Sequence, residues 1–215
     1  MNAVELLFSA GRTDGTTLRI TCADARELAQ KSAMRMDRDG DAHYDLLSCL
    51  QKSIRGSDAD AAVFYLARIL EGGDLLSACR RLLVIAAEDV GLAYPQGIIL
   101  AKACVDSARE LGLPEAVIPL ADLVVALATA PKSNSAYAAY HAAAADLRAG
   151  HGQEVPVHLQ SPLFKGYKYP HDYPNHYVKQ QYLPRDLADR QYYVFGENKT
   201  EQAAKAYWDK IKGGK

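Results

Sequence analysis

The chain has 215 residues and a formal net charge of −1, and 49% of its residues are hydrophobic. This length and composition predict one large domain, or one domain with a partial second, that can bury a substantial core without disulfides. The near-neutral charge excludes a global field that would draw the chain onto nucleic acid or anionic lipid, and it leaves room for a local basic patch.

The amino-terminal part is short and varied. Residues 2–10 carry an apolar helical pattern that starts abruptly at Met1, which predicts a piece of a longer protein. Residues 17–20 favour a brief extended segment, and a helix is expected from Thr21 to about Arg35. Residues 37–41 are charged and contain a glycine, so we interpret them as a linker.

From Ala42 the apolar period is helical and predicts an all-α, multi-helix array. Short connections predict antiparallel neighbours. Ser57, Asp74 and Ser133 are the expected caps. The helices are expected to end at Gly56, Gly72, Gly91, Gly112, just before Pro131, and at Gly150.

Residues 151–200 are expected to form an extended strap. Pro170 and Pro174 lack a backbone donor, and each clashes with the turn that would precede it in a helix. Residues 201–215 predict a terminal helix. We therefore expect one helical domain over 42–215, made of an array (42–150), the strap and the last helix, preceded by a different element over 1–36.

Cysteine usage favours reduced, buried thiols. Cys22, Cys49, Cys79 and Cys104 are widely spaced and include no Cys-x-x-Cys pair. That spacing is typical of neither a disulfide framework nor a zinc site. No secretory signal or long apolar span is present, so we expect a cytoplasmic protein without membrane contact.

The sequence offers little catalytic chemistry. It has neither a phosphate-binding loop nor a dinucleotide fingerprint, so nucleotide binding by those means is excluded. Glu88 and Asp89 are adjacent on a helix, point about 100° apart, and are best interpreted as ordinary structural charges. His171, Asp172 and His176 fit no metal-ligand spacing, so hydrogen-bonded strap residues are the favoured interpretation.

Two stretches are candidate contact surfaces. The first is an alanine-rich helix stripe that favours core packing over a subunit contact: Ala136, Tyr137, Ala139, Tyr140 and Ala143. The second is the strap, whose tyrosines could pin it to the helices or, with its basic residues, bind single-stranded nucleic acid. Its candidate residues are Lys165, Tyr167, Lys168, Tyr169, His171, Tyr173, Tyr177, Lys179 and Tyr182.

Six stretches resemble, in order and spacing, the replication-associated recombination protein A family (RarA, also MgsA). They cover residues 43–48, 52–58, 88–93, 128–134, 166–171 and 181–184. The stretch between Leu159 and Gly166 is shorter than in the family. The residues that match the family motifs are Arg55, Asp58, Glu88, Asp89, Lys132, Ser133 and Asn134.

This resemblance implies the end of an AAA+ lid over 1–36, followed by a clamp-loader-collar-like domain that forms homotetramers. It further implies a full-length ATPase that uses ATP and Mg, binds DNA at stalled replication forks, associates with the nucleoid and contacts single-stranded DNA-binding protein. The 215-residue chain itself is expected to bind no cofactor or metal and to catalyse nothing. Two alternatives stay open: a module that binds single-stranded DNA or a partner protein through the strap, and a small all-α enzyme.

Overall fold

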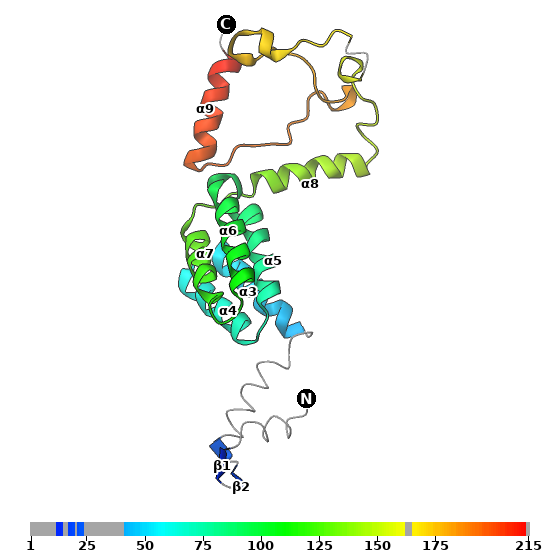
Figure 1. Ribbon diagram of the computed structural model, residues 1–215. Helices are drawn as coiled ribbons and strands as arrows, with labels where there is room; N and C mark the ends of the chain where they lie inside the picture. The colour runs from blue at the N-terminus through cyan, green and yellow to red at the C-terminus, as the bar shows by residue number, and fades with distance from the viewer. Residues whose placement is uncertain (1–11, 15–16, 20, 24–40, 162–164, 214–215) are drawn as a thin grey trace. The chain divides into compact units, whose positions relative to one another are not determined.

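The structure is a computed structural model that describes residues 12–14, 17–19, 21–23, 41–161 and 165–213 (Figure 1). The expected helix over 2–10, most of the one from Thr21 to Arg35, and residues 37–40 of the linker lie outside this described part. Contacts divide the chain into two units. The first comprises residues 1–85 and 98–129, and the second comprises residues 86–97 and 130–215.

A small antiparallel hairpin precedes the helices. Strand β1 (Arg12–Asp14) pairs with β2 (Thr17–Arg19). Arg12 lies opposite Arg19, and Asp14 lies opposite Thr17. The extended segment expected at 17–20 is confirmed, whereas the sequence analysis missed its partner strand.

Five helices form the body of the first unit, as the all-α prediction requires (Figure 1). Their apolar faces meet in a core whose largest fully buried side chains include Leu50, Ile54, Leu82, Leu120 and Leu127. Burial of this many Leu and Ile side chains supplies the main stabilisation of the unit. The helices are α3 (Asp41–Arg55), α4 (Ala59–Glu71), α5 (Leu75–Ile85), α6 (Gln96–Leu111) and α7 (Val117–Thr129).

The capping predictions have mixed outcomes. Asp74 caps α5 as expected, because its Oδ1 accepts a hydrogen bond from the Ser77 backbone N–H at 3.0 Å. The cap expected at Ser57 is wrong by one residue. Ser57 has a φ of 61°, and Asp58 is the N-cap of α4, accepting from the Ala61 N–H at 2.9 Å. Ser57 has the left-handed conformation that is common just after the end of a helix, whereas an N-cap residue such as Asp58 has an extended backbone.

The helix expected to run to Val90 changes type before its end. Helix α5 stops at Ile85, and a π-helical turn, η1 (Ala86–Val90), is followed by a 3-10 turn, η2 (Gly91–Ala93). π-helical turns inside helices are rare and frequently occur at functional positions. No period-counting argument distinguishes such a turn from continued α-helix, which is why the sequence analysis missed it.

The second unit holds α8 (Ser135–Arg148), the strap and α9 (Lys199–Gly213). Helix α9 begins two residues before the expected start. The strap is extended with short 3-10 turns, and Pro170 and Pro174 each occupy the first position of a turn, where no donor is needed. The turns are η3 (Val157–Leu159), η4 (Pro170–Asp172), η5 (Pro174–His176) and η6 (Arg185–Leu187).

The thiols differ from the prediction in their burial. All four cysteines are free, but only Cys79 is buried; Cys49 and Cys104 are half-buried and Cys22 is exposed. Burial raises the pKa of the Cys79 thiol, partly offset by the charge of Arg109. Within the described part of the chain, no helix combines the length and apolarity that a bilayer crossing requires.

Candidate assembly and binding surfaces

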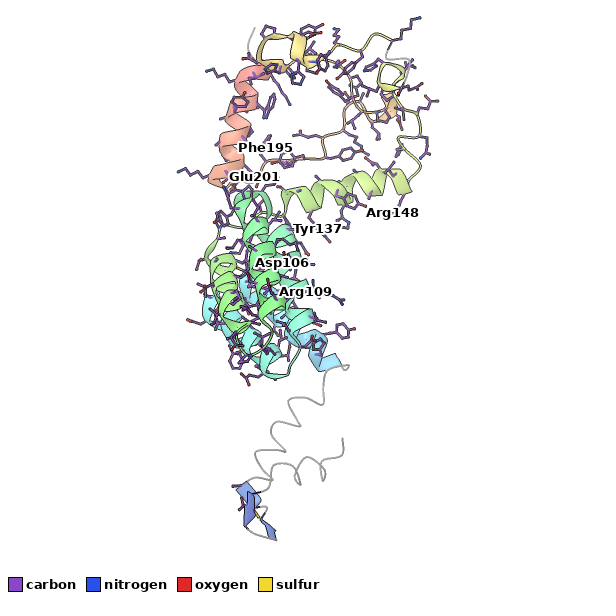
Figure 2. The ribbon with its side chains drawn as sticks, in the orientation of Figure 1. Asp106, Arg109, Tyr137, Arg148, Phe195 and Glu201 are labelled. Atoms are coloured by element: carbon purple, nitrogen blue, oxygen red, sulfur yellow. The ribbon has the colours of Figure 1, made fainter. Side chains whose placement is uncertain are left out.

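Glu201 is the centre of the hydrogen-bond network in the second unit. It lies in the first turn of α9 (Figure 2) and is only 2% exposed. Oε1 accepts from the Tyr193 hydroxyl at 2.9 Å, the Gly196 N–H at 3.1 Å and the Ser135 hydroxyl at 2.5 Å. Oε2 accepts from the side-chain amide of Asn198. A single carboxylate therefore joins the start of α8, the end of the strap and α9.

This network explains both the start of α9 and the charge of Glu201. Asn198 is the N-cap and accepts from the Glu201 N–H at 3.0 Å, so the two residues form a variant of the capping box. Burial by itself would raise the pKa of Glu201. Hydrogen bonds from Ser133, Ser135, the Gly196 N–H and Asn198 outweigh that effect and lower the pKa from 4.5 to about 2. Glu201 is therefore a structural anion at neutral pH.

Two family-motif stretches meet directly within this unit. The Ser133 N–H donates to the Asp89 carbonyl oxygen at 2.9 Å. Asp89 is 5% exposed, and its charge opposes the lowering of the Lys132 pKa that burial causes. Gly91 has a φ of +48°, and a Cβ there would lie 2.5 Å from the Ser133 carbonyl oxygen. These motif residues thus build a close backbone junction.

The cap expected at Ser133, which belongs to the same junction, is wrong by one residue. The N-cap position of α8 is Asn134, whose side chain makes no capping hydrogen bond. Ser133 instead accepts from the Ser135 N–H at 3.3 Å and donates to the Ser135 hydroxyl at 3.0 Å. Thr200 extends the junction to η2 by donating to the Ala93 carbonyl oxygen at 2.9 Å. Of the other matched motif residues, Arg55 ends α3 and Asp58 caps α4.

Helix α8 has an open apolar surface. None of its residues is buried, and Tyr140 and Leu147 are 71% and 56% exposed. Figure 2 shows Tyr137, a further half-exposed residue of this helix. The favoured interpretation of the alanine stripe, packing into the core of the same chain, is therefore not supported. On the face predicted as the alternative, Ala136, Tyr137 and Tyr140 are exposed, and Ala139 and Ala143 are half-buried.

The strap is attached to the helices by tyrosines that the sequence analysis did not select. Tyr192 donates to Asp146 of α8 at 2.9 Å, and Arg190 pairs with the same carboxylate at 2.9 Å. Tyr193 donates to Glu201 of α9. Burial and then the hydrogen bond to Asp146 raise the pKa of Tyr192, so its hydroxyl stays a donor. These tyrosines precede the N-cap at Asn198, and the Asn-x-x-Glu spacing was a signal for the start of α9, although not for its distant partners.

The selected strap residues lie mostly at the surface. Tyr169 and Tyr182 are 53% and 49% exposed, Tyr173 and the selected lysines are exposed, and Tyr167 and Tyr177 are half-buried. The rings of His171 and His176 lie 4.9 Å apart. Among the described residues, no group of three His, Cys, Asp or Glu side chains could hold a metal ion.

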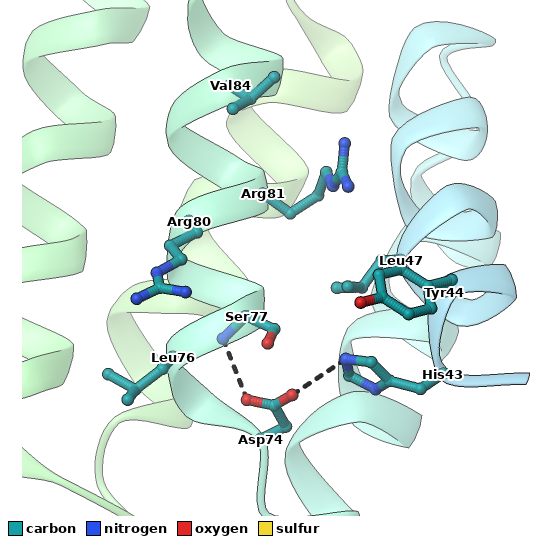
Figure 3. Close-up of a pocket in the computed structure, with 9 residues that line it drawn as sticks. All are labelled: His43, Tyr44, Leu47, Asp74, Leu76, Ser77, Arg80, Arg81 and Val84. Atoms are coloured by element: carbon teal, nitrogen blue, oxygen red, sulfur yellow. Dashed lines mark hydrogen bonds and ion pairs between the residues drawn. The ribbon is translucent and has the colours of Figure 1, made fainter. Parts of the chain in front are cut away.

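A separate open groove of about 530 Å³ lies in the first unit (Figure 3). His43 Nε2 and Asp74 Oδ2 are 3.1 Å apart at one end, so the cap of α5 also holds the first turn of α3. Arg81 donates to Gln51 at 2.9 Å. These polar groups serve the packing of α3 against α5, and they do not converge on a point where a substrate atom could react. The groove is lined by His43, Tyr44, Leu47, Asp74, Leu76, Ser77, Arg80, Arg81 and Val84.

Comparisons with known proteins agree with the sequence resemblance. Residues 56–212 match the family described as MgsA AAA+ ATPase C terminal, and residues 1–55 match the family described as AAA C-terminal domain. The chain is 49% identical over 222 residues to replication-associated recombination protein A of Bacillus subtilis, covering 98% of this chain and 53% of the relative.

More distant relatives show the same pattern. The protein of that name from Escherichia coli K12 is 38% identical over 205 residues, with 90% of this chain and 46% of the relative covered. ATPase WRNIP1 of Dictyostelium discoideum is 35% identical over 179 residues, with 78% and 20% covered. The chain spans about half the length of the two bacterial relatives. The chain therefore belongs to the replication-associated recombination protein A (MgsA) family of AAA+ ATPases and comprises its C-terminal domain.

Proposed function

We propose that this chain is the homotetramerisation domain of an AAA+ ATPase that acts in replication-associated recombination at stalled forks. The domain performs no chemistry of its own. It sets the number and spacing of the ATPase modules, and it transmits their motion through the segment that precedes α3. ATP and Mg are bound by the remainder of the full-length protein, which also contacts DNA.

The observation that carries this proposal is the small apolar core of the second unit. After Ala130, the one described apolar side chain that is buried is Leu187. Large apolar side chains are instead exposed over the whole unit: Tyr137, Tyr140, Leu147, Val155, Val157, Tyr169, Tyr173, Tyr182, Val194, Tyr207 and Trp208. Burial of apolar surface is the main force that offsets chain entropy, so a unit with so little of it gains stability by association.

Helix α8 adds a specific argument. An isolated helix of about 14 residues is marginal in water, and helices in proteins are stabilised mainly by packing an apolar face. Only the first turn of α8 and its Asp146 are tied to the rest of the unit by side-chain hydrogen bonds that the structure describes. In the middle of the helix Tyr140 is exposed between the half-buried Ala139 and Ala143, and in this proposal it packs against a second copy of the chain. Small residues there allow two helices to approach closely.

The catalytic alternative has no comparable support. Among the described residues, the carboxylate with the most strongly lowered pKa is Glu201, and its hydrogen bonds tie the start of α8 and the end of the strap to α9. A working general acid or base has its pKa near the operating pH, not near 2. The Asp74 and His43 pair beside the groove likewise caps and packs helices.

The test is the solution mass of the 215-residue chain, measured by light scattering after size exclusion over a hundredfold dilution. The proposal expects four times the 23.5 kDa of the single chain, and expects this mass to persist on dilution. A stable specific contact of this kind buries on the order of 1,200 Å² or more. A chain of single mass at every concentration contradicts the proposal.

A further inference from the structure

The turns of the strap and the end of α9 bring two clusters of aromatic rings together. In the first cluster, the ring centroids of Tyr169 and His171 lie 5.0 Å apart, and those of His171 and His176 lie 4.9 Å apart. All three residues are exposed. Buried ring pairs contribute to a core, but exposed pairs offer their faces to a ligand.

The second cluster follows without a gap, because Tyr177 is the next residue after His176. The ring of Tyr177 lies 6.4 Å from that of Trp208 on α9, and Tyr207 lies 5.4 Å from Trp208. Lys212 Nζ lies 5.7 Å from the centre of the Trp208 ring. Figure 1 shows the turns of the strap beside the C-terminal end of α9. We call residues 165–179 and 205–213 together the aromatic platform.

The backbone of the platform is held in an uncommon conformation. Asn175 and His176 have φ values of 57° and 53°, a region that residues other than glycine rarely occupy. The Gln180 side chain clamps the adjoining stretch: its Nε2 donates to the Lys168 carbonyl oxygen at 2.7 Å, and its Oε1 accepts from the Lys168 N–H at 3.2 Å. Strained backbone that the surroundings hold in place is concentrated at binding sites.

The charge of the platform is strongly positive although that of the whole chain is −1. Its acidic residues are Asp172 and Asp209, and Asp209 is already paired with Lys205 at 2.5 Å. The excess of lysine gives the platform a positive potential that the net charge of the chain conceals. All six of its lysines are exposed: Lys165, Lys168, Lys179, Lys205, Lys210 and Lys212.

We propose that the aromatic platform binds single-stranded nucleic acid, with bases stacked on Trp208, Tyr169 and the rings beside them and with phosphates near the lysines. Stacking on aromatic side chains requires bases with free faces, which a duplex does not offer. A protein partner is the weaker fit, because lysine is depleted at protein–protein interfaces while this surface is rich in it. This binding site is separate from the assembly that we propose for α8.

Trp208 makes the proposal directly measurable, since it is the single tryptophan of the chain. A fluorescein-labelled oligo(dT) of about 20 nucleotides is titrated with the 215-residue chain at low salt and followed by anisotropy. The quenching of Trp208 emission is recorded in parallel with an unlabelled strand. An abasic strand of the same length, which keeps the phosphates and lacks the bases, separates stacking from charge. We expect saturable binding, quenching of Trp208 and clearly weaker binding of the abasic strand.

The variants test rings and charges separately. Trp208→Ala is expected to weaken binding about tenfold, and Trp208→Phe to retain most of it, because stacking contributes on the order of 1–3 kcal/mol per base. Lys168→Gln and Lys210→Gln should each reduce the slope of the logarithm of the binding constant against the logarithm of the salt concentration by about 0.7. Phe64→Ala, at an exposed position of α4 in the first unit, is the matched aromatic control and leaves binding unchanged.

Three results would overturn the proposal: equal binding of the abasic and normal strands, no quenching of Trp208, or wild-type affinity in both Trp208→Ala and Lys210→Gln. The lysine variants keep the proposal falsifiable even if removing the indole loosens α9, since exposed lysines are not needed for folding. Circular dichroism of each variant verifies its helix content. The solution mass is an independent readout, so a failure of the nucleic-acid site is distinguishable from a failure of the assembly proposal.

Discussion

Asp89 and Ser133, which belong to two separate family-motif stretches, are joined by a backbone hydrogen bond of 2.9 Å. The Asp89 carbonyl belongs to the π-helical turn, and the Ser133 N–H lies two residues before α8. Gly91 lies against the same segment, because a Cβ at Gly91 would be 2.5 Å from the Ser133 carbonyl oxygen. Two of the motif stretches thus meet at a close backbone junction.

Gly91→Ala is expected to destabilise the second unit by about 2–4 kcal/mol. The substitution adds a left-handed backbone penalty to a clash with the backbone carbonyl of Ser133. Gly150→Ala is the matched control: its φ is +90°, but nothing lies within 4 Å of the added Cβ, so only the backbone penalty remains. Urea titrations followed by Trp208 fluorescence report on this unit. Equal midpoints for the two variants would contradict the close approach at Gly91.

Glu201→Gln is expected to destabilise the second unit at neutral pH and to remove a pH dependence. The pKa of Glu201 in the folded chain is about 2, lowered from 4.5. A lowered folded pKa stabilises the fold above the unfolded pKa, and this stabilisation is lost as the pH falls from about 4.5 towards 2. By linkage the effect amounts to about 3 kcal/mol. The measurement is the urea midpoint at pH 7, 5, 4 and 3 for both proteins.

The wild-type midpoint should fall steeply below pH 5, and that of Glu201→Gln should fall less. Gly213→Ala, at the far end of α9 where nothing lies within 4 Å of an added Cβ, serves as a control with the wild-type profile. Parallel pH profiles for wild type and Glu201→Gln would show that the carboxylate does not carry this stabilisation.

Asp74→Ala is expected to cost more stability than Asp58→Ala, although both residues are helix N-caps. Loss of a cap typically costs about 1 kcal/mol. Asp58 is exposed and contacts its own helix, whereas Asp74 is 7% exposed and also pairs with His43 of α3 at 3.1 Å. The extra cost should be about 1–2 kcal/mol, read from thermal unfolding by circular dichroism at 222 nm. Equal losses would mean that the His43 contact adds nothing.

The helical array could be predicted well from the sequence, because its signals are local. Apolar side chains such as Leu50, Leu82 and Leu123 recur at helical spacing, and glycine or proline marks each end. The change to a π-helical turn at Ala86 could not be predicted, since the apolar spacing continues through it and its contact with Ser133 joins residues distant in sequence. Likewise, no local sequence pattern predicts the strand Arg12–Asp14, which is defined by its pairing with β2.

The candidate sites were predicted only in part, because they depend on contacts distant in sequence. The aromatic strap was singled out, but its pairing with Trp208 of α9 is visible only in three dimensions. Tyr192, Tyr193 and Glu201 were missed, because nothing local indicates that their polar atoms meet Asp146 and Ser135. The stripe on α8 was assigned to the core because an apolar face on a helix is usually buried within its own chain.

The central claim is that the exposed face of α8 holds copies of the chain together. Tyr140→Glu places a charge on that face, and Ile99→Glu places the same charge on an equally exposed position of α6, since the two side chains are 71% and 72% exposed. Light scattering after size exclusion should give a tetramer for the wild type and for Ile99→Glu, and a smaller species for Tyr140→Glu. A tetramer that survives Tyr140→Glu undiminished, or a wild-type chain of single mass, would contradict the account.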